Sequence, residues 1–129
     1  MESFYVILSC EIAKFKVCLS MNTDLLKKYS ELHRQIKVID KLIIVLEAVK
    51  KNVANTSQYN FEGNSKYGKV FAIKIDQHRF YTIDTSKAGY RILYICRYEK
   101  KESQKNTKKI KQSIEAIDKI EINLIELWK

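Results

Sequence analysis

The chain contains no proline and only three glycines, Gly63, Gly68 and Gly89, in 129 residues. Linkers between domains are rich in glycine, serine or proline, and no such stretch is present. We therefore expect a single domain spanning residues 1–129. Apolar residues make up 46% of the chain and charged residues 30%, a balance that excludes a disordered polypeptide and is typical of a domain with its own buried core.

Long apolar runs and paired cysteines are also missing. No stretch approaches the roughly 20 apolar residues of a membrane-spanning helix, and the first residues lack the basic start of a signal peptide. Cys10, Cys18 and Cys96 lie in apolar segments without CxxC spacing, so we expect buried thiols of a cytoplasmic protein. Together with His33 and His78 they form no zinc-ligand pattern, and we expect neither a metal nor another cofactor.

Acidic residues are scarce in one part of the chain. The net charge is +9, and the segment from Lys66 to Lys111 holds 13 Lys/Arg against 4 Asp/Glu. The rest of the chain is balanced, with 11 residues of each sign. A basic block of this kind attracts polyanions by electrostatic steering and counterion release. A solvated basic face without a partner and an acidic protein partner are the alternatives.

The N-terminal half mixes strand and helix patterns. Residues 4–8 are rich in aromatic and β-branched side chains and predict a strand. Residues 11–21 fit either a strand or one face of a helix. Residues 24–51 predict a helix with Thr23 as its N-cap, either unbroken or divided near Ser30. Apolar residues of this helix recur every three or four positions, at Leu25, Tyr29, Leu32, Ile36, Ile39, Ile43 and Leu46. We expect this stripe to pack on the protein's own sheet; the alternative is a coiled-coil partner.

The C-terminal half predicts three strands followed by a helix. Residues 52–68 are polar and contain glycine, which predicts a long loop. The strands are predicted at 70–75, 80–83 and 91–98, joined by Asp76-Gln77 and by a hairpin-like connection over 84–89. Apolar residues of 103–120 again have helical spacing, which predicts a helix with Ser103 as its N-cap. Residues 121–129 fit neither a helix nor a strand clearly. The expected fold class is α+β: a small antiparallel sheet with an N-terminal helix or helical hairpin and a C-terminal helix.

Three cations of the basic segment are expected to meet on this sheet. Alternate residues of 71–75 are apolar and share one face, which puts Lys74 on the other. Arg79 and Arg97 lie near the ends of the next two strands, and short connections favour neighbouring strands. The three cations would then converge on one open face, where two guanidinium forks and a lysine suit a phosphate group.

Further residues of the segment fit RNA binding. Tyr81 and Tyr98 are candidates to stack on unpaired bases, and His78 is a candidate for proton exchange near neutral pH. Strand-end arginines commonly face solvent and a lone histidine is commonly structural, so each has a structural alternative. The lysines expected to attract the RNA backbone are Lys69, Lys100, Lys101, Lys105 and Lys108.

Several short motifs occur in an order that one protein family shares. They are SCEIAK at 9–14, FEG at 61–63, DQHRFYTID at 76–84, YICRYEKK at 94–101 and KKESQKNTKKI at 100–110. In this order and spacing they resemble the RelE, YoeB and HigB-like toxins of bacterial type II toxin–antitoxin systems. The resemblance covers roughly residues 3–118 and is strongest over 61–109.

The resemblance implies a RelE-like fold and a ribosome-dependent endoribonuclease that cuts mRNA and is held inactive by a cognate antitoxin. In such toxins the 2′-hydroxyl of the RNA attacks the adjacent phosphate, so no metal is required. Arg79 matches the family's strand arginine that holds the scissile phosphate. Arg97 and Tyr98 match its Arg-Tyr element, and Lys74 falls where the family has a basic residue on the preceding strand.

The chain departs from the family at the residues that transfer protons. Glu99-Lys100 stand where the YoeB type has His-Tyr, and Glu62 is near the position of the family's loop glutamate without matching it. The site then resembles the lysine- and arginine-rich RelE version. The alternative is a binding protein without catalysis, either a ParE-like inhibitor of DNA gyrase or a basic nucleic-acid-binding domain.

Overall fold

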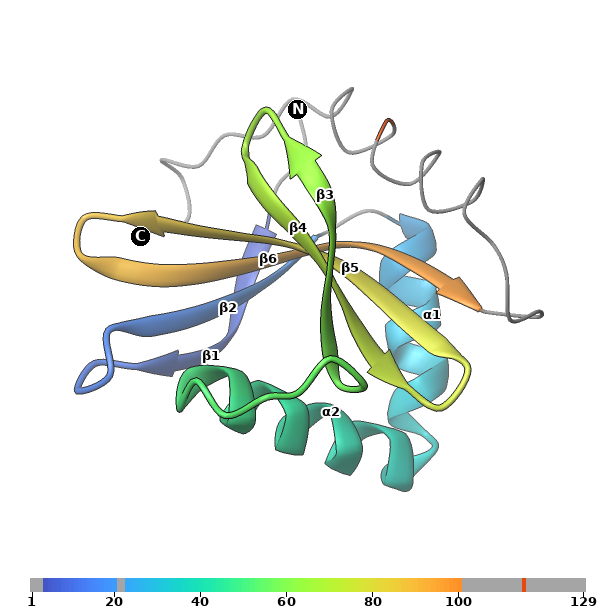
Figure 1. The fold of residues 1–129 in the computed structure, drawn as a ribbon. Helices are drawn as coiled ribbons and strands as arrows, with labels where there is room; N and C mark the ends of the chain where they lie inside the picture. The colour runs from blue at the N-terminus through green and yellow to red at the C-terminus, as the bar shows by residue number, and fades with distance from the viewer. Residues whose placement is uncertain (1–3, 21–22, 101–114, 116–129) are drawn as a thin grey trace.

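The computed structural model describes residues 4–20, 23–100 and the single position Glu115. Within these ranges the chain forms six strands and two helices (Figure 1). In chain order they are β1 (Phe4–Cys10), β2 (Phe15–Ser20), α1 (Thr23–His33), α2 (Ile36–Lys50), β3 (Tyr59–Ser65), β4 (Gly68–Ile75), β5 (His78–Lys87) and β6 (Tyr90–Lys100).

The six strands form one mixed sheet in the order β1-β2-β6-β5-β4-β3. Strands β2 and β6 pair in parallel, and every other neighbouring pair is antiparallel. The two helices carry the chain from β2 to β3 at the far edge, and three hairpin connections then bring it back to β6 beside β2. A parallel pair needs a long connection of this kind, which tight turns alone do not provide.

The expected fold class is wrong in its architecture. The structure is mostly sheet, the sheet is mixed, and the two helices lie between β2 and β3 rather than at the chain's ends. The strands predicted at 70–75, 80–83 and 91–98 are confirmed as consecutive antiparallel strands, each longer than predicted. Of the helix predicted over 103–120 only Glu115 is described, in helical conformation, and the unassigned residues 121–129 lie outside the described residues.

Strand β3 lies within residues 52–68, which the sequence predicted as loop. This strand contains asparagine, glycine and serine, all poor strand formers, and it lies at an edge of the sheet with exposed and half-buried positions. Pairing with β4 therefore decides its conformation, not local preference. Residues 11–21, which fitted either pattern, contribute β2, where five of six side chains are buried.

The helical segment divides at Arg34–Gln35, and each helix has its own buried stripe. Leu25 and Leu32 of α1 are buried, in agreement with the apolar stripe predicted from the sequence. Beyond the break the stripe changes phase, so that Ile43, expected in the core, is 47% exposed. Because α2 consists largely of isoleucine, leucine and valine, its composition did not reveal which side faces inward. Its buried residues are Val38, Leu42, Val45, Leu46 and Val49.

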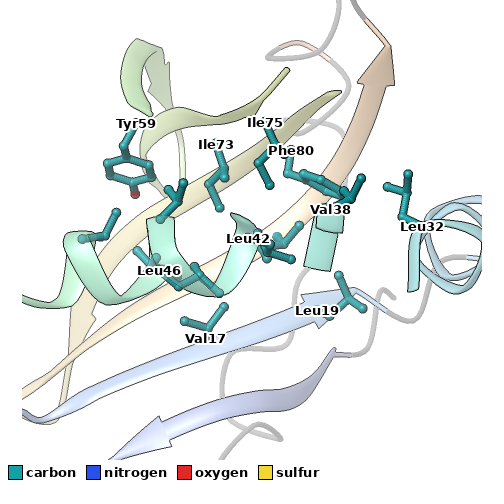
Figure 2. Close-up of a cluster of buried hydrophobic side chains, with 14 of the residues drawn as sticks. Val17, Leu19, Leu32, Val38, Leu42, Leu46, Tyr59, Ile73, Ile75 and Phe80 are labelled. Carbon is teal, nitrogen blue, oxygen red and sulfur yellow. The ribbon is translucent and has the colours of Figure 1, made fainter. Parts of the chain in front are cut away.

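Both helices pack on one face of the sheet, which we call the helix-covered face (Figure 1). Figure 2 shows the side chains that fill this layer, from β2, β3, β4 and β5 on one side and from both helices on the other. The other side of the sheet, which we call the opposite face, carries a second buried cluster: Phe4, Cys18, Val70, Ala72, Tyr81, Ile83, Ile92, Tyr94 and Cys96. Alternating side chains of the same strands therefore supply two separate cores.

The cysteines lie mostly where the sequence predicted. Cys18 and Cys96 are buried and Cys10 is half-buried. Burial raises the pKa of the Cys18 thiol to about 11, so it stays protonated at neutral pH. Neither α1 nor α2, the helices that the described ranges contain, is long and apolar enough to cross a bilayer.

Candidate phosphate-binding site

Strands β4, β5 and β6 bring Lys74, Arg79 and Arg97 to one face of the sheet. Lys74 lies directly across from Arg79, and Arg97 lies directly across from Tyr81. Alternation places Lys74 on the same side of β4 as Val70 and Ala72, which belong to the opposite-face cluster. The three cations therefore lie on the opposite face, at the end of the sheet where β4 turns into β5.

A shift in strand register decides the direction of Arg97. Ile95 pairs with Thr82 and Arg97 pairs with Tyr81, so Cys96 is an extra residue without a partner on β5. Strict alternation from Ile95 would have turned Arg97 toward the helices. The extra residue instead puts Cys96 and Arg97 on the same side, as bulges do when they redirect a side chain. Tyr98 then returns to the helix-covered face.

Two carboxylates share this part of the opposite face. Glu99 lies directly across from Arg79, and its Oε1 is 3.3 Å from Nη2 of Arg97. Glu62 lies in β3 where the register shifts between Phe61 and Gly63, and Nδ2 of Asn60 donates a hydrogen bond to its Oε1 at 3.1 Å. We call Glu62, Lys74, Arg79, Arg97 and Glu99 the basic cluster; its formal charge is +1.

Tyr81 lies among the charges of the basic cluster. Burial and, to a smaller extent, the nearby carboxylates of Glu62 and Glu99 raise its pKa to about 12, while Arg79 and Arg97 act against them. Tyr81 is therefore neutral at physiological pH. Because only 4% of its surface is exposed, its ring offers no platform on which a base can stack.

The two arginines use their donors differently. Nη1 of Arg79 donates to the backbone oxygens of Asp76 at 2.7 Å and His78 at 3.0 Å, which draws this guanidinium toward the β4–β5 turn. Arg97 donates from Nη2 to Glu99, while its Nε is buried and has no hydrogen-bond partner in the described part of the chain. Buried donors are normally paired, so Arg97 has capacity to bind a further acceptor.

His78 and Tyr98 form a separate pair on the helix-covered face. Nδ1 of His78 is 2.7 Å from the Tyr98 hydroxyl, and Nζ of Lys28 on α1 lies 5.8 Å from the centre of the Tyr98 ring. Burial lowers the pKa of His78, and the cation of Lys100 lowers it further. Burial also raises the pKa of Tyr98. At neutral pH the pair is therefore an uncharged imidazole and a protonated phenol, which can donate to Nδ1.

The structure thus divides the residues singled out in the sequence. Lys74, Arg79 and Arg97 share the opposite face, whereas His78 and Tyr98 lie on the helix-covered face. Lys69 shares the helix-covered side of β4, and Lys100 lies directly across from His78 on that same side. Lys101, Lys105 and Lys108 lie outside the described residues.

Two acidic residues of the cluster were not among the candidates from the sequence. Arg97 and Glu99 are two residues apart in a predicted strand, so the period-two rule would have placed them on one face. Glu62 was noted only as lying near the family's loop glutamate, and its place on this face could not be predicted because the strand that positions it was predicted as loop.

The basic cluster has the chemistry of an anion site. Two guanidinium groups and an ammonium suit a phosphate, which accepts hydrogen bonds from forked donors. In residues 4–20 and 23–100, no three His, Cys, Asp or Glu side chains lie close enough together to hold a metal ion. Comparison of the chain with protein-family models, with curated proteins and with solved structures finds no match.

Proposed function

We propose that this protein is the toxin of a toxin–antitoxin pair and acts as a ribosome-dependent endoribonuclease on mRNA. Two arguments support the proposal. The motifs at 76–84 and 94–101 resemble those of RelE, YoeB and HigB-like toxins. The observation that carries most weight is structural: Lys74, Arg79 and Arg97 lie on one face of three adjacent strands, and a register shift turns Arg97 to that face.

The reaction requires charge stabilisation more than a cofactor. The 2′-oxygen of the RNA loses its proton and forms a bond to the adjacent phosphorus, and the bond to the 5′-oxygen breaks. The 5′-oxygen takes up a proton from water, which leaves a cyclic phosphate and a 5′-hydroxyl. Negative charge builds on the phosphate oxygens during this step. We assign Arg97 and Arg79 to those oxygens and Lys74 to a supporting charge, since preorganised donors act most strongly where charge develops.

The reaction also needs a group that accepts the proton of the 2′-hydroxyl, and the basic cluster contains two carboxylates that are candidates for this role. Glu62 is oriented by Asn60 and forms no ion pair within the described ranges, so we assign it as the acceptor of the 2′-hydroxyl proton. His78 and Tyr98 face away from the cluster. We assign them to joining the ends of β5 and β6, which keeps the two arginine-bearing strands in register.

The partners follow from the same proposal. A cognate antitoxin would neutralise a chain of net charge +9, and the ribosome and its mRNA would attract it. A contact inhibitor without catalysis, of the ParE-like kind, is the second candidate. The observation that favours it is the apolar surface on α2, where Ile43 is 47% and Ile44 is 61% exposed.

Replacing Arg97 tests the proposed function. Arg97→Ala is expected to slow cleavage of mRNA on programmed ribosomes by on the order of 100–1000-fold, the effect of losing one preorganised donor to a developing charge. Arg97→Lys is expected to restore only part of the rate, because an ammonium does not replace the guanidinium fork. Arg34→Ala, at an exposed position between the helices, is the matched control and is expected to cleave normally.

The same variants separate the two candidate functions. Expression of the wild type is expected to arrest growth, whereas cells that express Arg97→Ala are expected to grow normally. If growth arrest survives in Arg97→Ala but disappears in Ile44→Glu, the protein acts by contact through α2 and the nuclease proposal is wrong.

A further inference from the structure

Glu99 occupies the position between the two arginines of the basic cluster. On β6 it follows Arg97 by two residues and contacts its Nη2 at 3.3 Å. Across the strands it lies directly opposite Arg79. Its charge also acts on Tyr81, which pairs with Arg97. A carboxylate therefore stands where the proposed function requires a phosphate.

The contact with Glu99 only partly satisfies Arg97. A guanidinium has five N–H donors, and the Nε donor of Arg97 is buried without a partner in the described part of the chain. A phosphate bound side-on would pair Nε and Nη2 together, which a single carboxylate oxygen on Nη2 does not do. The ion pair is part exposed on both sides, and exposed pairs are weak, so a better-fitting anion can replace the carboxylate.

We propose that Glu99 is an anionic gate on the RNA site. In the free protein its carboxylate holds Arg97, and the RNA phosphate must displace it to bind. This inference rests on the proposed function and adds to it a preference between two forms of the RNA substrate. Free RNA in dilute solution competes poorly with a tethered carboxylate, whereas RNA held by the ribosome beside the bound toxin has a high effective concentration. Glu99 thus favours ribosome-held mRNA over free RNA.

The isosteric substitution Glu99→Gln tests the gate. The amide can still accept a hydrogen bond from Arg97 but carries no charge. A fluorescent single-stranded RNA oligonucleotide, measured by anisotropy at low salt, is expected to bind Glu99→Gln about fivefold more tightly, the effect of one pairwise charge interaction at about 4 Å in water. Cleavage of the free oligonucleotide is expected to rise relative to cleavage of ribosome-bound mRNA.

A matched control distinguishes a local effect of Glu99 on the RNA site from a general effect of the protein's net charge. Glu47→Gln removes one carboxylate that is paired with Lys50 on α2, at 2.7 Å. This variant has the same net charge as Glu99→Gln, yet its affinity for the oligonucleotide is expected to equal that of the wild type. Equal gains in the two variants, or no gain in Glu99→Gln, would overturn the gate.

A double variant distinguishes failure of the gate from failure of the proposed function. If Glu99 acts by holding Arg97, the gain from Glu99→Gln disappears in the Arg97→Ala background, because no guanidinium is left to release. A gain that persists there means that Glu99 merely repels RNA, and the gate is wrong. A fall in ribosome-dependent cleavage by Glu99→Gln with unchanged RNA binding would make Glu99 the proton acceptor and also overturn the gate. The cleavage rate of Arg97→Ala alone tests the nuclease and is independent of these outcomes.

Discussion

Arg91 on β6 binds both carboxylate oxygens of Asp84 on β5, with Nε–Oδ1 at 3.1 Å and Nη2–Oδ2 at 2.6 Å. Asp84 also accepts a hydrogen bond from the Tyr59 hydroxyl of β3 at 2.9 Å. Nη1 of Arg91 reaches the end of α2, where it donates to the backbone oxygen of Val49 and to Oδ1 of Asn52. One guanidinium thus joins two central strands to the end of α2.

Replacing Arg91 is expected to destabilise the fold strongly. The Asp84 side chain is only 11% exposed, so Arg91→Ala leaves a nearly buried carboxylate without its cation. Breaking such a pair typically costs about 3–5 kcal/mol of unfolding free energy, which denaturant titration measures. Lys41→Ala is the control, since it breaks an ion pair with Asp76 in which both side chains are exposed. Its unfolding midpoint is expected to stay near that of the wild type; equal losses would contradict the network.

Two adjacent residues of α2 test the phase of the helix. Leu42 is 2% exposed and Ile43 is 47% exposed. Leu42→Ala is expected to lower the unfolding free energy by about 2–5 kcal/mol, because it leaves a cavity between α2 and the sheet. Ile43→Ala is expected to lower it by less than about 1 kcal/mol. The opposite ranking would restore the single stripe through Ile43 that the sequence predicted.

Two lysines on one strand test which face carries the function. Lys74 and Lys69 both belong to β4, but they lie on opposite sides of the sheet. Lys74→Ala is expected to slow ribosome-dependent mRNA cleavage by about tenfold, because a supporting charge near the phosphate is lost. Lys69→Ala is expected to leave the rate close to that of the wild type. Similar losses in both variants would indicate general attraction of RNA rather than a site.

The His78–Tyr98 pair is expected to make stability depend on pH. The pKa of His78 lies below its ordinary value of 6.5 in the folded chain, so the unfolded chain binds the proton more readily. The contribution to stability is complete above pH 6.5 and is lost as the pH falls below it toward the folded pKa. The charged and titratable groups that act on His78 are Lys100, Asp76, Arg79 and Lys28, with Tyr98 as its hydrogen-bond partner.

Thermal unfolding at pH 7.5 and pH 5.5 measures this effect. The melting temperature of the wild type is expected to fall between these two values, and the fall is expected to be smaller in His78→Gln. The exposed His33, changed to glutamine, is the control that should retain the wild-type difference. An identical pH dependence in wild type and His78→Gln would show that the half-buried His78–Tyr98 pair does not titrate in this range.

Sequence patterns were sufficient to predict the antiparallel order of β4, β5 and β6. Apolar residues alternate along 71–75, and the short connections at 76–77 and 84–89 favour antiparallel neighbours. From that pattern Lys74 could be assigned to the side of β4 away from Ile73. The second hairpin was misjudged only in length: Ala88 and Gly89, both with positive φ, form its turn, and the strand extends to Lys87.

Tertiary pairing alone decided the rest. Strand β3 has little strand preference of its own and forms because β4 offers a free edge, which is a contact that no local pattern reveals. The parallel pairing of β2 with β6 joins segments more than seventy residues apart. The direction of Arg97 depends on one extra residue at Cys96, and period-two alternation predicts the other face. The basic cluster was therefore predictable as a set of cations, but its geometry and its carboxylates arise from register, which is fixed only when the strands assemble.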